Sequence, residues 1–333
     1  MDNMPRTIDL RRPAAVWKEQ DVIEGRRVDT FVTIFLTTGC WWSAKKGCLM
    51  CGYNVDSTPN VKEEHLQAQL AKAMERYDGE AMVKIYTSGS FLDDNEIPPS
   101  FREEVFRTFG DAERILFESR AEFVTPQALD GLDRRSQIAI GLESANEDVL
   151  RKCVRKGFTV DDYRKAAEAL ANAGLPLRTY LLLKPPFLTE RAAVEDAVMS
   201  IAYTSKFSES VSVNPVNVQR GTVVESLFRR GDYRPPWLWS LVEVLRRGKA
   251  LSECRLMSSP SGGGTVRGVH NCDACDRKVL EAIQSFSFEQ DLAELDGLEC
   301  GCRDEWAALM DVQETMGTTV DVARHLSNEL EFD

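Results

Sequence analysis

The segment TTGCWWSAKKGCLMCGYNVDS (residues 37–57) places three cysteines and two adjacent tryptophans in one short stretch. Cys40, Cys48 and Cys51 are separated by seven and two residues, so one loop can present three thiolates to a single metal centre. Three thiolates suit a [4Fe–4S] cluster whose fourth iron has no protein ligand and can bind a substrate. Structural zinc is the alternative, but it needs a fourth ligand, and the nearest histidine, His65, is expected in the following helix.

The composition limits the class of protein. The chain has 333 residues, 43% of them hydrophobic, which is enough for one barrel-sized domain or for one domain with an appendage. The N-terminal residues lack the apolar run of a signal peptide, and no stretch approaches the roughly 18 apolar residues of a membrane span. We therefore expect a cytoplasmic protein with no membrane partner. In that compartment clustered cysteines indicate metal binding or redox chemistry rather than disulfides.

The formal net charge of −12 argues against nonspecific binding of nucleic acid by the whole surface. Local basic segments are nevertheless present, at residues 151–157 (RKCVRKG), 228–234 (FRRGDYR) and 245–249 (LRRGK). A solvated helix face is the preferred interpretation of each segment, and a nucleic-acid contact is the alternative.

Short β-branched or aromatic segments alternate with longer amphipathic ones, which is the pattern of βα units around a parallel sheet. Helices are expected over residues 61–77, 159–174 and 189–205, the second with Thr159 as N-cap and Gly174 as C-terminal stop. The six expected strands predict an α/β fold, a partial (β/α)6 barrel with the strand C-termini on one face. They cover residues 31–38, 81–88, 114–119, 137–144, 177–184 and 210–218.

A change of pattern after Pro235 suggests the domain organisation. Two helical patterns there flank a glycine-containing loop, with Gly262 to Gly264 in succession. We expect an N-terminal extension over residues 1–30, a barrel over 31–249, and a C-terminal cysteine-rich metal-binding module with helices over 250–333.

A second cysteine group lies in that module. HNCDAC (residues 270–275) and ECGC (299–302) supply four thiols in two pairs, separated by about one helix of sequence, at Cys272, Cys275, Cys300 and Cys302. This spacing favours a closed tetrahedral zinc site, and a second iron–sulfur cluster is the alternative. His270 could replace one thiolate, although we interpret it as a loop residue. Cys153 and Cys254 are expected to be buried, and His325 to lie in a C-terminal helix.

Together with the three-cysteine loop, three further segments resemble the radical S-adenosylmethionine (SAM) superfamily. They lie at the ends of expected strands: TSGSFLDD (87–94), FESRAEF (117–123, similar to Elongator-type members) and IGLES (140–144). The first cysteine gap departs from the superfamily pattern, which most often has three residues there rather than seven. The resemblance implies a partial barrel, a [4Fe–4S] cluster on Cys40, Cys48 and Cys51, and SAM as cofactor.

The resemblance also implies roles for individual residues. Ser88, Gly89 and Ser90 would cradle the methionine end of SAM. Tyr53 would stack on the adenine, with simple packing as the alternative, and Trp41 and Trp42 would shield the cluster. Contacts to the remaining polar groups of SAM are expected from Glu118, Arg120, Glu143 and Ser144. Weaker candidates at or beyond strand ends are Lys184, Asn214 and Arg220.

The full set of motifs, including VNVQRGT (216–222) and both cysteine groups, is similar to the archaeal radical SAM family of archaeosine formation, RaSEA, over about residues 30–310. That family works with archaeosine synthase, which attaches lysine to a 7-cyano-7-deazaguanine base in the D-loop of tRNA. The resemblance implies a carbon–nitrogen lyase that cleaves this lysine adduct and leaves archaeosine. Its partners would be the lysine-modified tRNA, archaeosine synthase and an electron donor.

Two other classes remain open. The chain could be another radical SAM tRNA-modifying enzyme, either a methylthiotransferase or an Elongator-like enzyme, although no acetyl-coenzyme A domain is recognisable. It could also be a nonenzymatic zinc-binding adaptor for tRNA or protein. Measurements of iron content and SAM cleavage distinguish these hypotheses.

Overall fold

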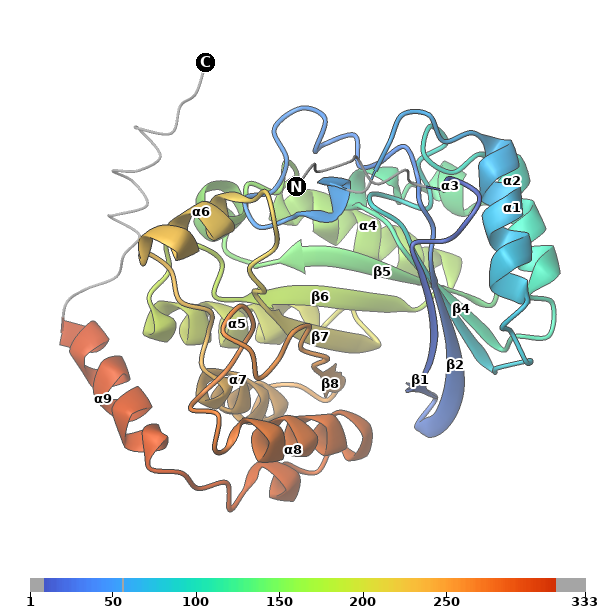
Figure 1. Cartoon of the computed structure of the whole chain (residues 1–333). Coiled ribbons are helices and arrows are strands. Elements are labelled where there is room, and N and C mark those ends of the chain that lie inside the picture. The colour runs from blue at the N-terminus through green and yellow to red at the C-terminus, as the bar shows by residue number, and fades with distance from the viewer. Residues whose placement is uncertain (1–8, 56, 316–333) are drawn as a thin grey trace. The chain divides into compact units, whose positions relative to one another are not determined.

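The computed structural model describes residues 9–55 and 57–315 in two compact units. Unit 1 comprises Met1–Ala44 and Tyr53–Ile138, and unit 2 comprises Lys45–Gly52 and Ala139–Asp333. Figure 1 shows their helices and strands. Within the described ranges, no helix combines the length and apolarity that a membrane crossing requires.

The strands β1 to β4 of unit 1 are neighbours in chain order within the eight-stranded sheet of the described residues. β1 (Ala15–Ile23) and β2 (Arg26–Ile34) form an antiparallel hairpin, drawn in dark blue in Figure 1. β3 (Met82–Tyr86) and β4 (Arg114–Glu118) then add in parallel, with Phe31 opposite Val83 and Val83 opposite Ile115. The helices of this unit are α1 (Glu63–Met74), α2 (Pro99–Thr108) and α3 (Pro126–Leu129), with short 3₁₀ turns at Tyr53–Val55 and Ala121–Phe123.

Aromatic side chains fill the space between this sheet and its helices. Phe31, Phe35, Phe101 and Phe109 have at most 1% of their surface exposed. Phe35 meets Phe101 of α2 edge to face with ring centroids 5.6 Å apart, and Phe31 lies 5.9 Å from Phe109. Burying such large rings supplies much of the hydrophobic stabilisation of this unit.

β5 (Ser136–Glu143) runs from unit 1 into unit 2. In unit 2, β6 (Leu177–Leu183), β7 (Ser210–Pro215) and β8 (Arg255–Met257) are parallel neighbours. A π-helix spans Val149–Val154, and a 3₁₀ turn spans Leu292–Leu295. The α-helices are α4 (Val160–Ala173), α5 (Glu190–Thr204), α6 (Val223–Arg230), α7 (Leu238–Ala250), α8 (Asp276–Glu289) and α9 (Cys302–Thr315).

The expected α/β architecture is confirmed, and the six predicted strands correspond to β2 through β7. The caps of α4 are also as predicted, because the Thr159 hydroxyl accepts a bond from Asp162 N and Gly174 has a left-handed φ of 67°. β2 ends at Ile34 rather than at residue 38. Just beyond it, Leu36 bonds through its backbone N–H and C=O to the buried side chain of Gln69, which replaces a neighbouring strand.

Two strands were not predicted. The sequence of β1 shows no long apolar run, because its four central residues at positions 18–21 are charged or polar, and only Asp21 and Ile23 are buried. β8 has three residues, too few for a periodic pattern. β1 falls within the predicted N-terminal extension and β8 within the predicted C-terminal module, whose bounds stay predictions.

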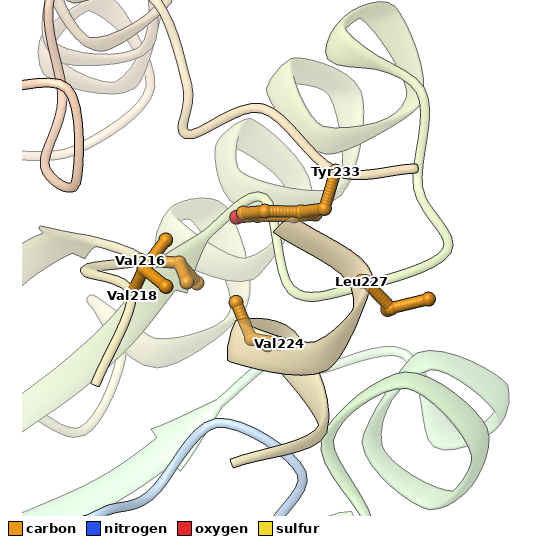
Figure 2. Close-up of a cluster of buried hydrophobic side chains, with 5 residues drawn as sticks. All are labelled: Val216, Val218, Val224, Leu227 and Tyr233. Atoms are coloured by element: carbon orange, nitrogen blue, oxygen red, sulfur yellow. The ribbon is translucent and has the colours of Figure 1, made fainter. Parts of the chain in front are cut away.

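A hydrophobic cluster in unit 2 supports the second half of the cysteine loop. Figure 2 shows its five buried members, which come from the segment after β7, from α6 and from the chain beyond α6: Val216, Val218, Val224, Leu227 and Tyr233. Met50, which lies between Cys48 and Cys51, packs against this cluster. Because the cluster is formed by valine, leucine and tyrosine side chains with few accessible rotamers, it gives the loop a rigid base.

Candidate metal centres and cofactor-binding segments

A buried carboxylate organises the segment after β3. Glu96 is 3% exposed. Its Oε1 accepts hydrogen bonds from Gly89 N (3.0 Å) and Thr37 Oγ1 (2.6 Å), and its Oε2 accepts one from Ser90 N (2.6 Å). Burial raises the pKa of Glu96, although the three hydrogen bonds act in the opposite direction. The carboxylate thereby joins the predicted SAM cradle to the residues that precede Cys40.

Gly89 lies against the backbone of Cys40. A Cβ added at Gly89 would overlap Glu96 Oε2 and would lie 2.8 Å from Cys40 Cα and 3.2 Å from Cys40 Cβ. Gly39, the residue before Cys40, has a left-handed φ of 95°. Glycine is therefore required at position 89 by close approach and is favoured at position 39 by backbone conformation. The predicted cradle and the first cysteine are thus neighbours within unit 1.

Ser88 and Tyr53 are also brought together in unit 1. The Ser57 hydroxyl donates to Ser88 Oγ over 2.8 Å, and Ser88 Oγ lies 3.4 Å from the carbonyl oxygen of Tyr53. Tyr53 is 60% exposed, so burial in the core does not explain its position. Its stacking on adenine stays a prediction.

The backbone at the end of β4 is tied to the cradle. Phe91 N donates to the carbonyl oxygen of Glu118 over 2.9 Å, and Arg120 N donates to Ser90 Oγ over 3.0 Å. Ser90 therefore bonds through its N–H to Glu96 and through its hydroxyl to the segment after β4. The structure brings together these parts of two motifs that the sequence places about 30 residues apart.

The side chain of Arg120 belongs to an aromatic group. Its guanidinium forms an ion pair with Glu122 at 2.6 Å and lies 5.7 and 5.9 Å from the ring centroids of Trp41 and Trp42. Trp41 Nε1 donates to the same Glu122 carboxylate over 3.1 Å. The two indole rings meet edge to face with centroids 5.8 Å apart. Arg120 thus positions both tryptophans, and its predicted contact to SAM remains a prediction.

Cys48 and Cys51 lie in the part of the loop that belongs to unit 2. Arg155 donates from Nε to Gly47 O (2.9 Å) and from Nη2 to Lys46 O (2.8 Å), while Leu49 N donates to Val154 O (3.1 Å). Arg155 follows the π-helix and has a left-handed φ of 58°, which is uncommon for a non-glycine residue and aims its side chain at the loop.

The other side of this loop is held by the segment before α6. Gly52 N donates to Gln219 Oε1 over 2.6 Å, and Val224 N donates to Leu49 O over 3.3 Å. A Cβ added at Gly52 would lie 2.9 Å from Gln219 Cβ and 3.0 Å from Arg220 O, so the close approach requires glycine. The loop that carries Cys48 and Cys51 is therefore fixed by hydrogen bonds on both sides.

Glu143 and Ser144 already have internal partners in unit 2. Glu143 has a left-handed φ of 72°, and its Oε1 pairs with Lys156 Nζ at 2.8 Å. Ser144 is 0% exposed, donates to Asp196 Oδ1 over 2.8 Å and accepts a bond from Asn146 N over 3.0 Å. Burial raises the pKa of Asp196 to about 6, with the Ser144 hydroxyl acting in the opposite direction. The predicted contacts of Glu143 and Ser144 to SAM stay predictions.

The weaker candidates have different environments. Lys184 is buried, pairs with Glu190 at 2.7 Å and donates to Arg234 O over 2.9 Å. These contacts give Lys184 a structural role. Asn214 lies on β7 and accepts a bond from Ser212 Oγ over 3.0 Å. Arg220 is exposed in the loop before α6.

The second cysteine group forms a compact site. The sulfur atoms of Cys272, Cys275, Cys300 and Cys302 all lie within 4.8 Å of one another. Three of their separations are 3.9 Å (272–275), 3.5 Å (272–300) and 3.7 Å (275–302). Ligands placed tetrahedrally around one ion at about 2.3 Å, the usual Zn–S distance, would be about 3.8 Å apart. The four thiols therefore fit a single tetrahedral metal ion, whereas ligands of an iron–sulfur cluster bind separate irons and must lie farther apart.

The protein also supplies hydrogen bonds to these sulfurs. Trp239 Nε1 donates to Cys302 Sγ over 3.3 Å, and Asn271 Nδ2 lies 3.4 Å from Cys275 Sγ. The backbone N–H of Cys302 lowers the pKa of Cys300 to about 7, while desolvation raises the pKa of Cys302 and of Cys275. Such donors stabilise thiolates and orient metal ligands.

The remaining predicted residues are placed as follows. His65 lies in α1 as expected, where its Nδ1 accepts a bond from Lys62 N over 3.0 Å. His270 is a loop residue as expected, and its Nδ1 lies 2.8 Å from Gly268 O. Cys153 is 2% exposed, as predicted, but Cys254 is only half-buried and bonds to Ser252. His325 lies outside the described residues.

Glu96, Gln219 and Arg155 organise these segments but were not singled out from the sequence. Gln219 and Arg155 act on partners distant along the chain, for example Gln219 on Gly52, so local spacing carries no signal of these contacts. Glu96 had one weak signal, since it follows two aspartates in a polar stretch directly after a predicted strand end.

Comparison with known proteins identifies the class. Residues 34–197 match the Radical SAM superfamily model. This class implies SAM and a [4Fe–4S] cluster as cofactors, and the donor set of this chain fits them, because Cys40, Cys48 and Cys51 are half-buried thiols outside any disulfide and lie in a loop held by close backbone approach. An archaeal Elp3 structure from Methanocaldococcus infernus aligns with a TM-score of 0.49 at 16% identity, covering 71% of this chain and 59% of that one.

Two full-length relatives are more specific. Archaeosine synthase subunit beta of Methanosarcina acetivorans is 39% identical over 322 residues, covering 92% of this chain and 93% of the relative. The protein of the same name from Thermococcus kodakarensis is 39% identical over 311 residues, covering 89% and 96%. The chain belongs to the archaeosine synthase subunit beta family, which confirms the resemblance drawn from the motifs.

Proposed function

We propose that this chain is the radical SAM lyase of archaeosine formation in tRNA. In this reaction the carbon–nitrogen bond of a lysine adduct on a 7-deazaguanine base in the D-loop is cleaved, and the amidine of archaeosine remains on the base. The observation that carries the proposal is the 39% identity, over nearly the full length of both chains, to relatives named archaeosine synthase subunit beta. The partners would be lysine-modified tRNA, archaeosine synthase and an electron donor.

We assign the [4Fe–4S] cluster to Cys40, Cys48 and Cys51 and the methionine end of SAM to Ser88, Gly89 and Ser90. When bound, the reduced cluster and SAM supply a 5′-deoxyadenosyl radical that can take hydrogen from the lysine carbon chain. The protein's own contribution is to hold its ligands in place and keep out water. Glu96 supports this, since its carboxylate fixes both amide groups of the cradle, Gly89 N and Ser90 N.

The aromatic group formed by Trp41, Trp42 and Arg120 would shield the first cluster from solvent. Its tryptophans directly follow Cys40, and the Arg120 guanidinium holds both rings through cation–π contacts of 5.7 and 5.9 Å. An apolar cover of this kind limits access of water and oxygen to iron and controls its potential.

We assign a structural zinc ion to Cys272, Cys275, Cys300 and Cys302. The supporting observation is that three of the sulfur separations, 3.5, 3.7 and 3.9 Å, match the edges of a tetrahedron around one ion. All four ligand positions would be filled by thiolates, as in structural rather than catalytic zinc sites.

An anaerobic assay tests the proposed function. The reconstituted and reduced protein is mixed with SAM, lysine-modified tRNA and archaeosine synthase, and both 5′-deoxyadenosine and archaeosine are measured. Cys48→Ala should abolish both products while the C-terminal metal remains, and Cys254→Ala, a change of the same residue type outside the two cysteine groups, should leave both intact. Deoxyadenosine formation by wild type without any archaeosine would refute the substrate, and SAM cleavage by Cys48→Ala would refute the cluster assignment.

A further inference from the structure

Two basic segments of unit 2 are hydrogen-bonded to the loop that carries Cys48 and Cys51. The loop itself contributes Lys45 and Lys46. Hydrogen bonds join it to the end of the π-helix, from Arg155 to Lys46 O and from Leu49 to Val154. A third bond, from Val224 N to Leu49 O, joins the loop to the start of α6. Segments that are about 100 and 170 residues away in sequence therefore flank one loop.

These segments have a charge opposite to that of the chain. Residues 45–52, 147–157 and 219–232 contain nine lysines and arginines and four aspartates and glutamates, while the whole chain has a net charge of −12. Six of the nine cations are exposed, and we call these six the basic group: Lys45, Lys46, Arg151, Arg220, Arg229 and Arg230. Cations concentrated in one part of an acidic protein are typical of a surface that binds an anionic partner.

The carboxylates of these segments leave the cations accessible. Arg151 pairs with Asp148 at 3.0 Å, Arg230 with Asp232 at 3.0 Å and Arg229 with Glu225 at 3.0 Å. The side chains of the three arginines nevertheless remain 71%, 64% and 69% exposed. The pairs of Arg151 and Arg230 are exposed on both sides and contribute at most about 1 kcal/mol each, so a polyanion can engage these guanidinium groups, and the exposed guanidinium of Arg229 has donors beyond the one that Glu225 accepts.

We infer that the basic group binds the phosphate backbone of the RNA substrate next to the Cys48–Cys51 loop. The inference rests on the proposed function and adds to it the surface by which this chain holds RNA. Arginine suits the task because its planar donors match phosphate oxygens, and four of the six residues are arginines. Since the chain as a whole is acidic, this group should position the RNA rather than attract it from a distance.

Two double variants from different segments test the inference, Lys45→Gln with Lys46→Gln, and Arg229→Gln with Arg230→Gln. The matched control is Arg277→Gln with Lys278→Gln, which removes the same charge from an exposed part of α8 in the same unit. Binding of a fluorescent tRNA transcript to each reconstituted protein is measured between 50 and 200 mM salt. Iron content, zinc content and melting temperature confirm that each variant is folded.

We expect both basic-group variants to weaken tRNA binding about tenfold at 100 mM salt and the control to bind as wild type does. The slope of log affinity against log salt should become less steep by about 1.4–1.8 for each pair, because each lost phosphate contact removes about 0.7–0.9 from it. In the archaeosine assay the KM for lysine-modified tRNA should rise while kcat is retained at saturating tRNA.

Several results would overturn the inference. One is unchanged affinity of both variants, another is equal loss in the control, and a third is no salt-dependent tRNA binding by wild type. Loss of affinity for archaeosine synthase with unchanged tRNA affinity would instead assign the group to a protein interface. Failure of the proposed function is recognised separately, because wild type would then release deoxyadenosine without forming archaeosine whatever the variants bind.

Discussion

Replacing Glu96 by glutamine should loosen the cradle that we assign to SAM. The carboxylate accepts three hydrogen bonds, from Thr37 Oγ1, Gly89 N and Ser90 N, and an amide offers a single acceptor oxygen. If that oxygen keeps the first two bonds, the new NH₂ group faces Ser90 N, and two donors then meet in a buried site. A hydrogen bond to a charged group contributes about 1.5–3 kcal/mol. Relief of the buried charge offsets part of this loss, so we expect a decrease of about 2 kcal/mol in the free energy of unfolding at pH 7.5.

The same change should weaken SAM binding about tenfold, since each 1.4 kcal/mol needed to restore the cradle raises the dissociation constant by that factor. Calorimetry of SAM binding to the reconstituted protein and urea unfolding of the zinc-loaded protein measure the two effects. Glu103→Gln is the matched control, because Glu103 is an exposed glutamate on α2 of the same unit. Wild-type SAM affinity and stability in Glu96→Gln would refute the assignment of the carboxylate as the support of the cradle.

Three further predictions concern other parts of the chain. Cys302→Ser should lower the zinc content, measured by mass spectrometry, while iron is retained; full zinc occupancy would contradict the four-thiolate site. Val224→Ala should lower the free energy of unfolding by about 2 kcal/mol, because it opens a cavity at a 0% exposed position in the cluster of Figure 2, whereas Val266→Ala at a 66% exposed position should have no measurable effect. Equal stability of the two variants would contradict this. The pKa of Asp196 is raised from 3.8 to about 6, so the folded state takes up a proton as the pH falls, and the site destabilises the fold most above pH 6. Asp196→Asn should therefore gain stability relative to wild type as the pH rises, by about 1.5 kcal/mol between pH 5 and 7.5, and a constant difference in chemical unfolding would refute the assignment.

The fold could be predicted from the sequence because the signals for its strands and helices are local. The strands β2 to β7 are short runs of buried apolar residues, and α4 begins and ends at Thr159 and Gly174 with the expected caps. The second cysteine group was found for the same reason, since the two cysteines of each pair are close in sequence and α8 lies between the pairs. Where a feature depends on residues within one or two turns of each other, composition and spacing are sufficient.

The contacts around the predicted SAM residues could not be predicted from local sequence signals. The motif predicts that Arg120 contacts a polar group of SAM. In the structure its guanidinium pairs with Glu122 and lies against Trp41 and Trp42, which are about 80 residues away in sequence. Ser144 was chosen on the same grounds, and its hydroxyl donates to Asp196 on α5. A motif identifies which strand end a residue follows. It does not identify which of the neighbouring groups satisfies its hydrogen bonds, because that depends on the packing of distant segments.

The residues that position Cys40, Cys48 and Cys51 would therefore be as specific to the proposed cluster site as the cysteines themselves. Cys40 is placed by Gly89 and Glu96, and the loop of Cys48 and Cys51 is placed by Arg155 and Gln219. Neither Gly52 nor Gly89 can carry a side chain without displacing a backbone or buried neighbour. If the three cysteines hold a cluster as proposed, the long backbone of the seven-residue first gap has to be restrained, and within each unit these contacts restrain the segment that carries its cysteines.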